Sequence, residues 1–528
     1  MSGETHSQMK IYLIGVAIIA ALSTTKPVSA QATNPIVFAD VPDVAMIRVG
    51  DTYYMSSTTM HMSPGLPIMS SKDLVNWKLV SYAYDTLVDN DEMNLSNGMS
   101  AYGSGSWASS IRYHQGTYYV TTFAATSGKT HIYTTNNIEK GPWKETSFSP
   151  ALHDHSLFFN DDGKVFMVYG NKELKLVELN KDLSGIKDGG INKIIIQDSS
   201  LPSQSIGNSG LGEGSQLFKF QGKYYLFNIT WPKGGMRTVI IHRADKLTGR
   251  WEGKVALTDL GVAQGGLIDK PDGTWFAYLF RDYGSVGRIP YLLPVKWEDG
   301  WPVLGENGKV PQTLKLPTSK GLIPGIVASD DFTRKKGEAS LPLVWQWNHN
   351  PDYKSWSLGA RPGYMRITTA RADTSFLTAR NTLTQRTIGP VCTGSTSLNV
   401  SHMKDGDFAG LGLLQKNYGL VGVRIEGNRK MVVMVNAGTG KPVEAQAIPV
   451  NQRVVFFKAE CEFTDKRDVA DFFYSLDGKK WMPIGSPLRM TYTLPHFMGY
   501  RFALFNYATK TAGGYADFDF FLISDKKG

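Results

Sequence analysis

Cysteines are scarce in this sequence of 528 residues, which contains only Cys392 and Cys461. A zinc site made of cysteine ligands is therefore excluded by number. The pair is compatible with one disulfide in an oxidising compartment, and equally with two isolated buried thiols. The sequence also lacks the lysine of a phosphate-binding loop and the G-x-S-x-G motif of a serine nucleophile. Neither of these two chemistries is expected.

Clusters of basic residues are missing too, although the formal net charge is +9. Nucleic-acid binding usually requires Lys and Arg gathered along one element, with aromatic side chains between them. Here the basic residues are spread through the whole chain. We therefore interpret them as a solvated surface and expect no nucleic-acid partner.

Long apolar runs are absent after residue 30, so no membrane span is expected. Near the start, Lys10 precedes an apolar run over residues 11–22, and the small residues 28–30 resemble a cleavage site. Residues 1–30 therefore predict a secretory signal peptide and export of a soluble protein to the periplasm. Residues 1–8 have neither the positive charge nor the apolarity of a signal, and we interpret them as an added or alternative start.

Helical periodicity is scarce, whereas a turn followed by a pair of aromatic or large apolar residues recurs five times. The pairs are Tyr53–Tyr54, Tyr118–Tyr119, Val165–Phe166, Tyr224–Tyr225 and Trp275–Phe276. A turn-and-strand unit that returns after about 50 residues is typical of four-stranded propeller blades. The sequence thus predicts an all-β chain in which residues 33–310 form a five-bladed β-propeller.

Equivalent positions ahead of these pairs carry residues able to do chemistry. Eleven or twelve residues before the second member of each pair stand Asp43, Trp107, Asp154, Glu213 and Gln264. The strand that enters each blade is the innermost one, so these positions should surround one end of the central channel. Carboxylates are costly to desolvate unless they are paired or used. We therefore predict a functional site there, with the glycines beside Glu213 giving a ligand close access.

Three carboxylates suit the hydrolysis of a glycosidic bond, in which one acid protonates the leaving oxygen and one carboxylate activates water or attacks the sugar. A third carboxylate can raise the pKa of the acid by like-charge repulsion. Metal binding is the competing use, but the dense oxygen cluster of a calcium loop is absent from the sequence. His153 and His155 flank Asp154, and strand alternation would point them to the opposite face. We expect them to be packing or surface residues rather than ligands.

Several longer segments carry a family resemblance. They are "NPIVFADVPDVAMIRVGDTYYM", "HDHSLFFNDDGKVFMVYG", "GEGSQLFKFQGKYYLF" and "VAQGGLIDKPDGTWFAYLFRDYGSVGRIPYLLPVKWEDGWPVLG". These segments resemble the five-bladed propeller of the family 43 glycoside hydrolases. The similarity is strongest to the bacterial α-L-arabinofuranosidase and β-xylosidase branch, which includes enzymes that trim xyloglucan oligosaccharides.

The resemblance implies an inverting mechanism with roles assigned by position. Asp43 would be the general base that activates water, and Glu213 would be the general acid. Asp154 would raise the pKa of this acid and orient it. Arg288, in "GSVGR", resembles the family's channel arginine, which binds sugar hydroxyls or pairs with a catalytic carboxylate.

The resemblance also suggests substrate-binding residues. Trp107 would be a sugar platform, and Ser109 and Ser110 replace the Pro-Asp pair of many members, so that Ser110 becomes a candidate contact. Gln264 is a further candidate and stands where many members carry a histidine near a calcium or a water cluster. No cofactor is expected to be required, and a structural calcium is possible but not expected. His61, in "STTMHMSPGLPI", is a candidate contact at the pocket rim, with a packed histidine as the alternative.

The composition changes after a Pro-, Gly- and Lys-rich stretch, which we interpret as a linker over residues 311–328. Short alternating strands with Gly and Asp turns then predict a β-sandwich of the jelly-roll or concanavalin-like type over residues 329–528. This part resembles the accessory domain of many xylosidases of the family, in which a loop near its start reaches the active site. Phe332 is the candidate wall residue. A purely stabilising domain and a sugar-binding module with exposed tryptophans are the alternatives.

The leading hypothesis is an exo-acting, inverting α-L-arabinofuranosidase that acts on plant hemicellulose oligosaccharides of the xyloglucan or arabinoxylan type. A β-xylosidase on the same scaffold is the nearest alternative, because the two sugars present similar hydroxyls to a shallow pocket. A non-catalytic carbohydrate-binding propeller would require the loss of a catalytic carboxylate, and all three are present. We expect a monomer or a weak oligomer whose partner is an oligosaccharide substrate.

Overall fold

The computed structural model describes residues 31–528, with the exception of residues 208–209, 323–324, 336, 339 and 495. The predicted signal peptide, residues 1–30, lies outside the described residues. Within the described ranges the helices are short 3₁₀ segments, which include η1 (Leu201–Ile206), η2 (Gly284–Val286), η4 (Phe376–Thr378) and η5 (Thr464–Lys466). In this part of the chain no helix has the length and apolar character that crossing a membrane requires.

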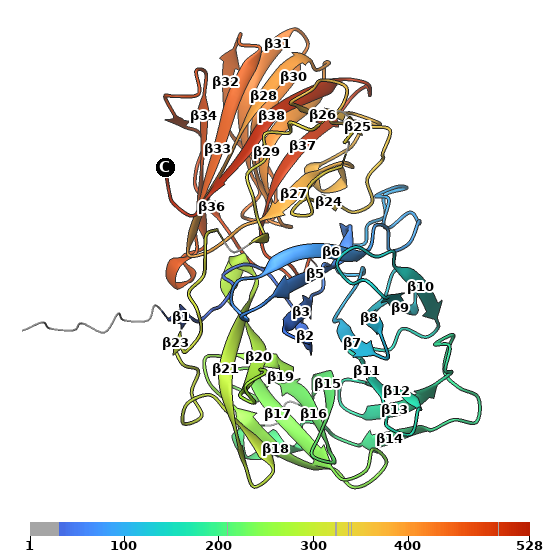
Figure 1. Ribbon diagram of the computed structural model, residues 1–528. Helices are drawn as coiled ribbons and strands as arrows, with labels where there is room; N and C mark the ends of the chain where they lie inside the picture. Colours follow the sequence, from blue (N-terminus) through green and yellow to red (C-terminus); the bar gives the residue numbers. More distant parts are fainter. Residues whose placement is uncertain (1–30, 208–209, 323–324, 336, 339, 495) are drawn as a thin grey trace, which may run out of the picture.

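Five four-stranded antiparallel sheets follow one another along the first part of the chain (Figure 1). The first two contain β2 (Ala45–Val49), β3 (Thr52–Ser56), β5 (Gly65–Ser71) and β6 (Lys78–Tyr84), then β7 (Ser110–His114), β8 (Thr117–Ala124), β9 (Lys129–Thr135) and β10 (Lys144–Phe148). The third contains β11 (Ser156–Phe159), β12 (Val165–Tyr169), β13 (Leu174–Leu179) and β14 (Asn192–Ile196). The last two contain β15 (Glu213–Phe220), β16 (Lys223–Thr230), β17 (Thr238–Ala244) and β18 (Glu252–Leu257), then β19 (Ala263–Asp269), β20 (Trp275–Asp282), β21 (Arg288–Glu298) and β22 (Trp301–Leu304).

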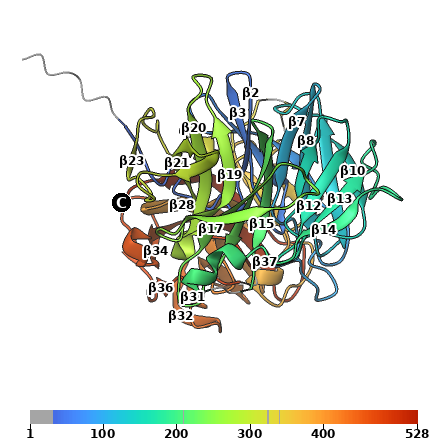
Figure 2. The same cartoon turned by 90° about the horizontal axis from the view of Figure 1, so that it is seen from below.

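The five repeated residue pairs of the sequence all fall at the start of the second strand of a sheet. Each repeat therefore marks the hairpin between the first two strands of a blade. The first strands β2, β7, β11, β15 and β19 contact one another in a closed ring. In Figure 1 the other strands of each sheet lie outside this ring, and Figure 2 shows the same blades from below. The predicted five-bladed propeller is confirmed.

Each blade is built from one contiguous stretch of chain, so the first and the last blade meet without a strand from one end of the chain completing the sheet of the other. The short strand β1 (Ala32–Thr33) pairs instead with β23 (Thr313–Leu314), beyond the fifth blade. The side chain of Asn34 adds hydrogen bonds of 2.8 Å to the carbonyl oxygens of Leu292 and Pro311. The two ends of the propeller segment are thus fastened to each other.

The second part of the chain forms two facing antiparallel sheets, as the predicted sandwich requires. The first sheet has the order β32 (Val443–Val450), β31 (Arg429–Asn436), β30 (Gly419–Glu426), β29 (Asp407–Leu414), β37 (Arg501–Ala508), β27 (Leu383–Arg386), β24 (Gln346–Asn348) and β4 (Met62–Ser63). The second has the order β25 (Trp356–Ser357), β26 (Met365–Thr368), β38 (Tyr515–Ser524), β28 (Val391–His402), β33 (Val454–Glu462), β34 (Val469–Ser475) and β35 (Met482–Pro483), with β36 (Leu488–Arg489) also on β34.

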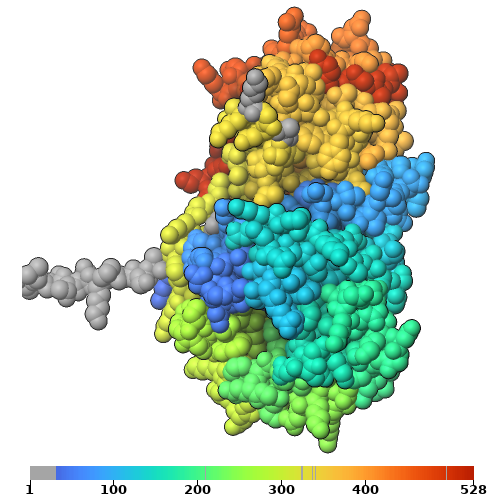
Figure 3. All heavy atoms as spheres, turned by 45° about the vertical axis from the view of Figure 1, so that its right-hand side comes forward, coloured from blue at the N-terminus to red at the C-terminus, as the bar shows by residue number. Residues whose placement is uncertain are grey.

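One sheet of the sandwich includes a strand from the propeller. The strand β4, which lies between β3 and β5 of the first blade, pairs with β24, so that Met62 faces Asn348 and Ser63 faces Trp347. The blue segments of this blade accordingly form the contact between the two lobes in the space-filling view (Figure 3). The largest hydrophobic core is also shared, since it contains Trp77 from the first blade and Phe521 from β38. The two lobes are therefore one packed body.

The two cysteines lie directly opposite each other on the paired strands β28 and β33. Both thiols are buried and free, so the alternative of two buried thiols describes this structure. Burial raises the pKa of the Cys461 thiol well above its ordinary value. These thiols are consequently packing groups of the sandwich core.

The shared sheet and core predict cooperative unfolding of the two lobes. Calorimetry of the chain should show a single transition, because separating the lobes would expose the edge of β24 and the buried side chain of Met62. A Met62→Asp substitution should lower the temperature of this whole transition, whereas Val443→Asp, at a site that is 57% exposed on β32, should leave it nearly unchanged. Two separate transitions in the unmodified protein would contradict the shared core.

Candidate active site

The five positions that the sequence pattern singled out all lie where an innermost strand begins. Asp43, Trp107 and Asp154 stand just before β2, β7 and β11, whereas Glu213 opens β15 and Gln264 is the second residue of β19. A small pocket at the propeller axis is lined by Asp43, Val44, Ala108, Asp154, His155, Gly214, Ser215, Gln216, Gln264 and Gly265. Three of the five positions, Asp43, Asp154 and Gln264, thus line the same pocket.

Irregular backbone aims these side chains at the axis. Asp43, Asp154 and Gln264 have positive φ angles of 51°, 47° and 57°, which non-glycine residues seldom adopt. Register shifts interrupt the ladders after Glu213 and after Ala263, as β-bulges do. Strained or bulged backbone of this kind is concentrated at functional sites, where the surrounding structure holds it in place.

Asp43 is 5% exposed, and two side chains of the fifth blade hold it. Arg288 donates from Nη1 to Asp43 Oδ1 at 2.8 Å, and Gln264 donates from Nε2 to the same oxygen at 3.0 Å. Burial raises the pKa of Asp43 above its ordinary value, although the Arg288 guanidinium opposes this shift. The result is a fixed carboxylate of increased basicity at the bottom of the pocket, which suits the activation of a water molecule.

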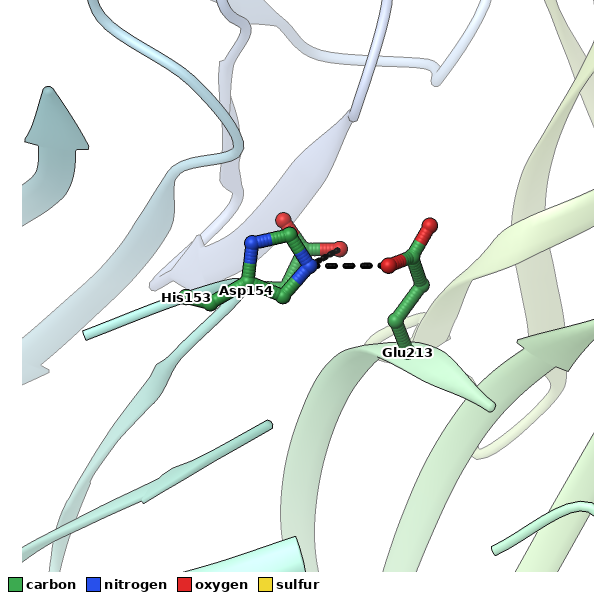
Figure 4. Close-up of side chains that lie close together, drawn as sticks. All are labelled: His153, Asp154 and Glu213. Carbon is green, nitrogen blue, oxygen red and sulfur yellow. Dashed lines mark hydrogen bonds and ion pairs between the residues drawn. The ribbon is translucent and has the colours of Figure 1, made fainter. Parts of the chain in front are cut away.

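Asp154 and Glu213 form the opposite side of the site, together with His153 (Figure 4). Asp154 is 6% exposed, and its Oδ2 accepts a hydrogen bond of 2.9 Å from the backbone N–H of Gly214. Burial and the neighbouring carboxylates of Glu213 and Asp43 raise the pKa of Asp154 to about 7, against the opposite effect of His153. The side chain of Glu213 is 25% exposed and therefore nearer the mouth of the pocket. One of its oxygens can reach a substrate from there.

The expectation that His153 points to the face opposite Asp154 is wrong. Its Nε2 lies 2.8 Å from Glu213 Oε2 and 3.9 Å from Asp154 Oδ2. The strand β11 begins only at Ser156, and His153 and Asp154 lie in a turn, so strand alternation does not apply to them. His155 does have a packing role: its Nδ1–H donates to the carbonyl of Leu152 at 2.8 Å, while Nε2 lies 2.7 Å from the Thr121 hydroxyl.

The glycines beside Glu213 serve packing between the elements around the site rather than ligand access alone. A Cβ at Gly214 would lie 2.7 Å from Gln264 Cγ, and one at Gly212 would lie 2.3 Å from the Ser199 hydroxyl. Gly214 also has a φ of 70°. Glycine is thus required on both sides of the carboxylate because neighbouring side chains approach its backbone.

The sandwich contributes a different wall residue from the predicted Phe332. Phe332 is fully buried and stacks on Trp345 inside the sandwich, with ring centroids 5.9 Å apart. Phe497, in the loop that precedes β37, reaches the site instead: its ring lies 4.7 Å from Trp107, and its carbonyl accepts from Arg288 Nη2 at 3.2 Å. No sequence pattern pointed to Phe497, because no repeat connects the loops of the sandwich with the axis of the propeller.

Phe497 borders a second pocket of about 140 Å³ next to Arg288. It is also lined by Arg237, whose Nε forms a 2.8 Å ion pair with Asp282 Oδ2. Arg237 was not singled out from the sequence, since an isolated arginine in a loop carries no pattern. Two guanidinium groups therefore lie beside the buried Asp43, and guanidinium groups are suited to binding hydroxyls.

The remaining candidate contacts have mixed outcomes. Trp107 is partly buried against Phe497, which leaves a platform role open to it. Ser110 is fully buried, and its hydroxyl accepts from the backbone N–H of Leu157 at 3.2 Å, so it does not face the pocket. His61 is also fully buried, with its ring centroid 4.6 Å from that of His349, which is the packed alternative rather than a rim contact.

The donor atoms of His153, Asp154 and Glu213 lie within 4.8 Å of one another, a spacing that a metal ion could use. These atoms already have protein partners, because His153 bonds to Glu213 and Gly214 donates to Asp154. We therefore interpret the group as carboxyl groups and an imidazole that share protons.

Comparisons with known proteins agree with this geometry. The model of the family described as "Glycosyl hydrolases family 43" matches residues 32–302, and the one described as "Beta xylosidase C-terminal Concanavalin A-like domain" matches residues 329–524. A β-xylosidase of Formosa agariphila is 29% identical over 92% of this chain and 89% of its own length. A non-reducing end α-L-arabinofuranosidase of Bacteroides ovatus is 29% identical over 63% of this chain and 64% of its own length.

Among solved structures, a Bacteroides eggerthii protein described as bifunctional GH43-CE is 64% identical and superimposes with a TM-score of 0.92. The match covers 95% of this chain but only 64% of that protein, so the chain spans less than two thirds of its length. The similarity therefore covers both lobes, and the other protein has a further part that is not matched.

The raised pKa of Asp154 predicts a pH-dependent difference in stability. Its folded-state pKa of about 7 lies above the ordinary value of 3.8, so the folded state holds this proton more tightly than the unfolded state does. The contribution is favourable at low pH and is lost as the pH rises from about 4 to about 7. Asp154→Asn should therefore gain stability relative to the unmodified protein over this window, as measured by urea unfolding. A constant difference between pH 4 and pH 7 would contradict the raised pKa.

Proposed function

Because this chain belongs to family 43 of the glycosyl hydrolases, we propose that it is an inverting exo-glycosidase that removes terminal α-L-arabinofuranosyl residues from plant hemicellulose oligosaccharides. The observation that carries the proposal is the meeting of Asp43, Asp154 and Glu213 at one end of the propeller axis. Asp43 and Asp154 line the same small pocket, and Gly214 bonds to Asp154. The Bacteroides ovatus relative, named for this activity, supports the choice of sugar.

The roles of the carboxylates follow from their surroundings. Asp43 takes a proton from a water molecule, whose oxygen forms the new bond to the anomeric carbon. Glu213 gives its proton to the leaving glycosidic oxygen as the old bond breaks. Asp154 is placed by the Gly214 N–H and influences the protonation of its neighbours through its charge. A separate water as nucleophile gives inversion, because it attacks from the face opposite the leaving group.

Arginine side chains supply the remaining polar contacts of the sugar in this proposal. Arg288 holds the base through Nη1, and its Nε is a buried donor with no partner among the described residues. Trp107 and Phe497 form an apolar wall on the same side. The reaction uses carboxyl groups and water, and the proposal assigns no metal or other cofactor to it. Export to the periplasm is part of the proposal and depends on residues 1–30.

A β-xylosidase is the second candidate, and a specific observation favours it. The Formosa agariphila relative, which matches almost the whole chain, is named a β-xylosidase. A pocket formed by carboxylates, arginines and aromatic rings would bind hydroxyls of either pentose, so the two activities need separate measurement.

The proposed function predicts the following rates. The initial rate of hydrolysis of an aryl α-L-arabinofuranoside should exceed that of an aryl β-D-xylopyranoside when both are measured with one enzyme preparation. The reverse order would favour the β-xylosidase.

Glu213→Gln should lower kcat/KM on an oligosaccharide by about 10²–10⁴-fold, because the amide has no proton to give. Its melting temperature should stay nearly unchanged, since the side chain is 25% exposed. Full activity of Glu213→Gln would contradict the assigned general acid.

A further inference from the structure

His153 has an unusual position for a residue that only packs. Its side chain is 42% exposed, yet its Nε2 lies 2.8 Å from Oε2 of the general acid Glu213. Figure 4 shows the imidazole next to the Asp154 carboxylate, with a dashed line from the ring nitrogen to Glu213. The hydrogen bond occupies Oε2, which leaves Oε1 of Glu213 to face a glycosidic oxygen.

The surroundings of His153 differ on its two sides. On one side lie the carboxylates of Asp154 and Glu213, with Asp43 farther away. The Phe123 ring packs against the imidazole in a T-shaped arrangement, with ring centroids 5.2 Å apart. On the outer side is an open cleft of about 310 Å³, whose lining includes Tyr169, Asn171, Lys172, Glu173 and Lys175. His153 thus stands between the catalytic carboxylates and a space that solvent can enter.

The charge of the imidazole is set by these neighbours. Burial by itself would lower the pKa of His153, but the hydrogen bond to Glu213 and the charge of Asp154 outweigh it and raise the pKa to about 9. At neutral pH the ring therefore holds a proton on the nitrogen that faces Glu213. An imidazole whose pKa is raised in this way holds its proton firmly, so its Nε2–H acts as a lasting hydrogen-bond donor to Glu213 rather than as a source of protons.

We propose that His153 is a positioning residue for Glu213: its Nε2–H donates to Oε2 and so holds the other oxygen, Oε1, toward the glycosidic oxygen. This inference rests on the proposed function, in which Glu213 protonates the leaving oxygen. It assigns to His153 a part in the reaction that neither the fold nor the packing of the turn requires.

The protons balance over one turnover. Glu213 gives its proton to the glycosidic oxygen and becomes a carboxylate, while Asp43 receives a proton from the attacking water. After the released alcohol leaves, Glu213 takes a proton from solvent in the cleft, while His153 keeps its own proton. Asp43 loses its proton to solvent, so the enzyme returns to its starting state with one water molecule consumed.

The leaving group provides the sharpest test. A dinitrophenolate departs without a proton, whereas an alkyl alcohol or a sugar needs one from the general acid. His153→Ala should therefore lower kcat/KM for the alkyl glycoside by about 10²-fold. On the dinitrophenyl glycoside of the same sugar the rate should change little. Equal losses on both substrates, or no loss on either, would overturn the proposal, because a merely structural role does not depend on the leaving group.

A second variant separates proton supply from a simple hydrogen bond. His153→Gln keeps an N–H donor that can reach Glu213 but carries no transferable proton. We expect it to restore most of the rate that His153→Ala loses on the alkyl glycoside, because the hydrogen bond to Oε2 is kept. A loss in His153→Gln as large as that in His153→Ala would overturn the positioning role.

Two controls keep the interpretation clear. His114 is a half-buried histidine of β7 that stacks on Phe159 at 4.3 Å, away from the pocket, so His114→Ala should leave the ratio of the two rates unchanged. Glu213→Gln should show the same dependence on leaving group as His153→Ala. If Glu213→Gln lacks this dependence, the proposed function fails; if Glu213→Gln shows it and His153→Ala does not, the present inference fails alone. Melting temperatures of all variants verify that they are folded.

Discussion

Two carboxylates held almost out of water impose the constraint from which the rest of the site follows. Asp43 and Asp154 are 5% and 6% exposed, and a charge in such a place is tolerated only with compensating partners. The partners come from other blades: Arg288 and Gln264 of the fifth blade bond to Asp43 of the first, and Gly214 of the fourth bonds to Asp154 of the third. Closing the ring and assembling the site are therefore the same structural event.

The sandwich belongs to this account because it completes the wall that the propeller leaves open. Phe497 contacts Trp107 and accepts a hydrogen bond from the same arginine that holds Asp43. The pairing of β4 with β24 and the common core fix the position of the sandwich relative to the propeller. A second domain that was only a carbohydrate-binding appendage would need neither a shared sheet nor a residue at the axis.

The sequence predicted the parts of the fold that repeat. The recurring aromatic pairs identified the second strand of each blade, and counting back from them found Asp43, Asp154 and Gln264 around one pocket. It also found Glu213, which precedes the pocket residue Gly214. Features without a period were missed or misplaced. The orientation of His153 depends on a positive φ at Asp154, which no residue pattern reveals.

Contacts between the two lobes were equally invisible in the sequence. A wall residue was expected at Phe332 on the basis of family resemblance, but Phe332 packs on Trp345 inside the sandwich. Phe497 contacts Trp107 instead, in a sandwich that is joined to the propeller through the pairing of β4 with β24. Ser110 was a candidate because Ser109 and Ser110 replace the Pro-Asp pair of many family members, and His61 because its segment was expected at the pocket rim. Their burial shows that neighbours along a strand or loop need not share a face. Long-range packing decides such positions.

The central claim is that Asp43 activates a water molecule while Glu213 protonates the leaving oxygen. The stereochemistry of the first-formed sugar tests this most directly, and proton NMR can follow it before the product mutarotates. Our account predicts inversion, so that an α-linked arabinofuranoside releases the β-anomer first, or a β-linked xyloside the α-anomer. Initial release of the anomer with the substrate's own configuration would contradict the account, because retention requires a carboxylate of the enzyme to attack the sugar itself.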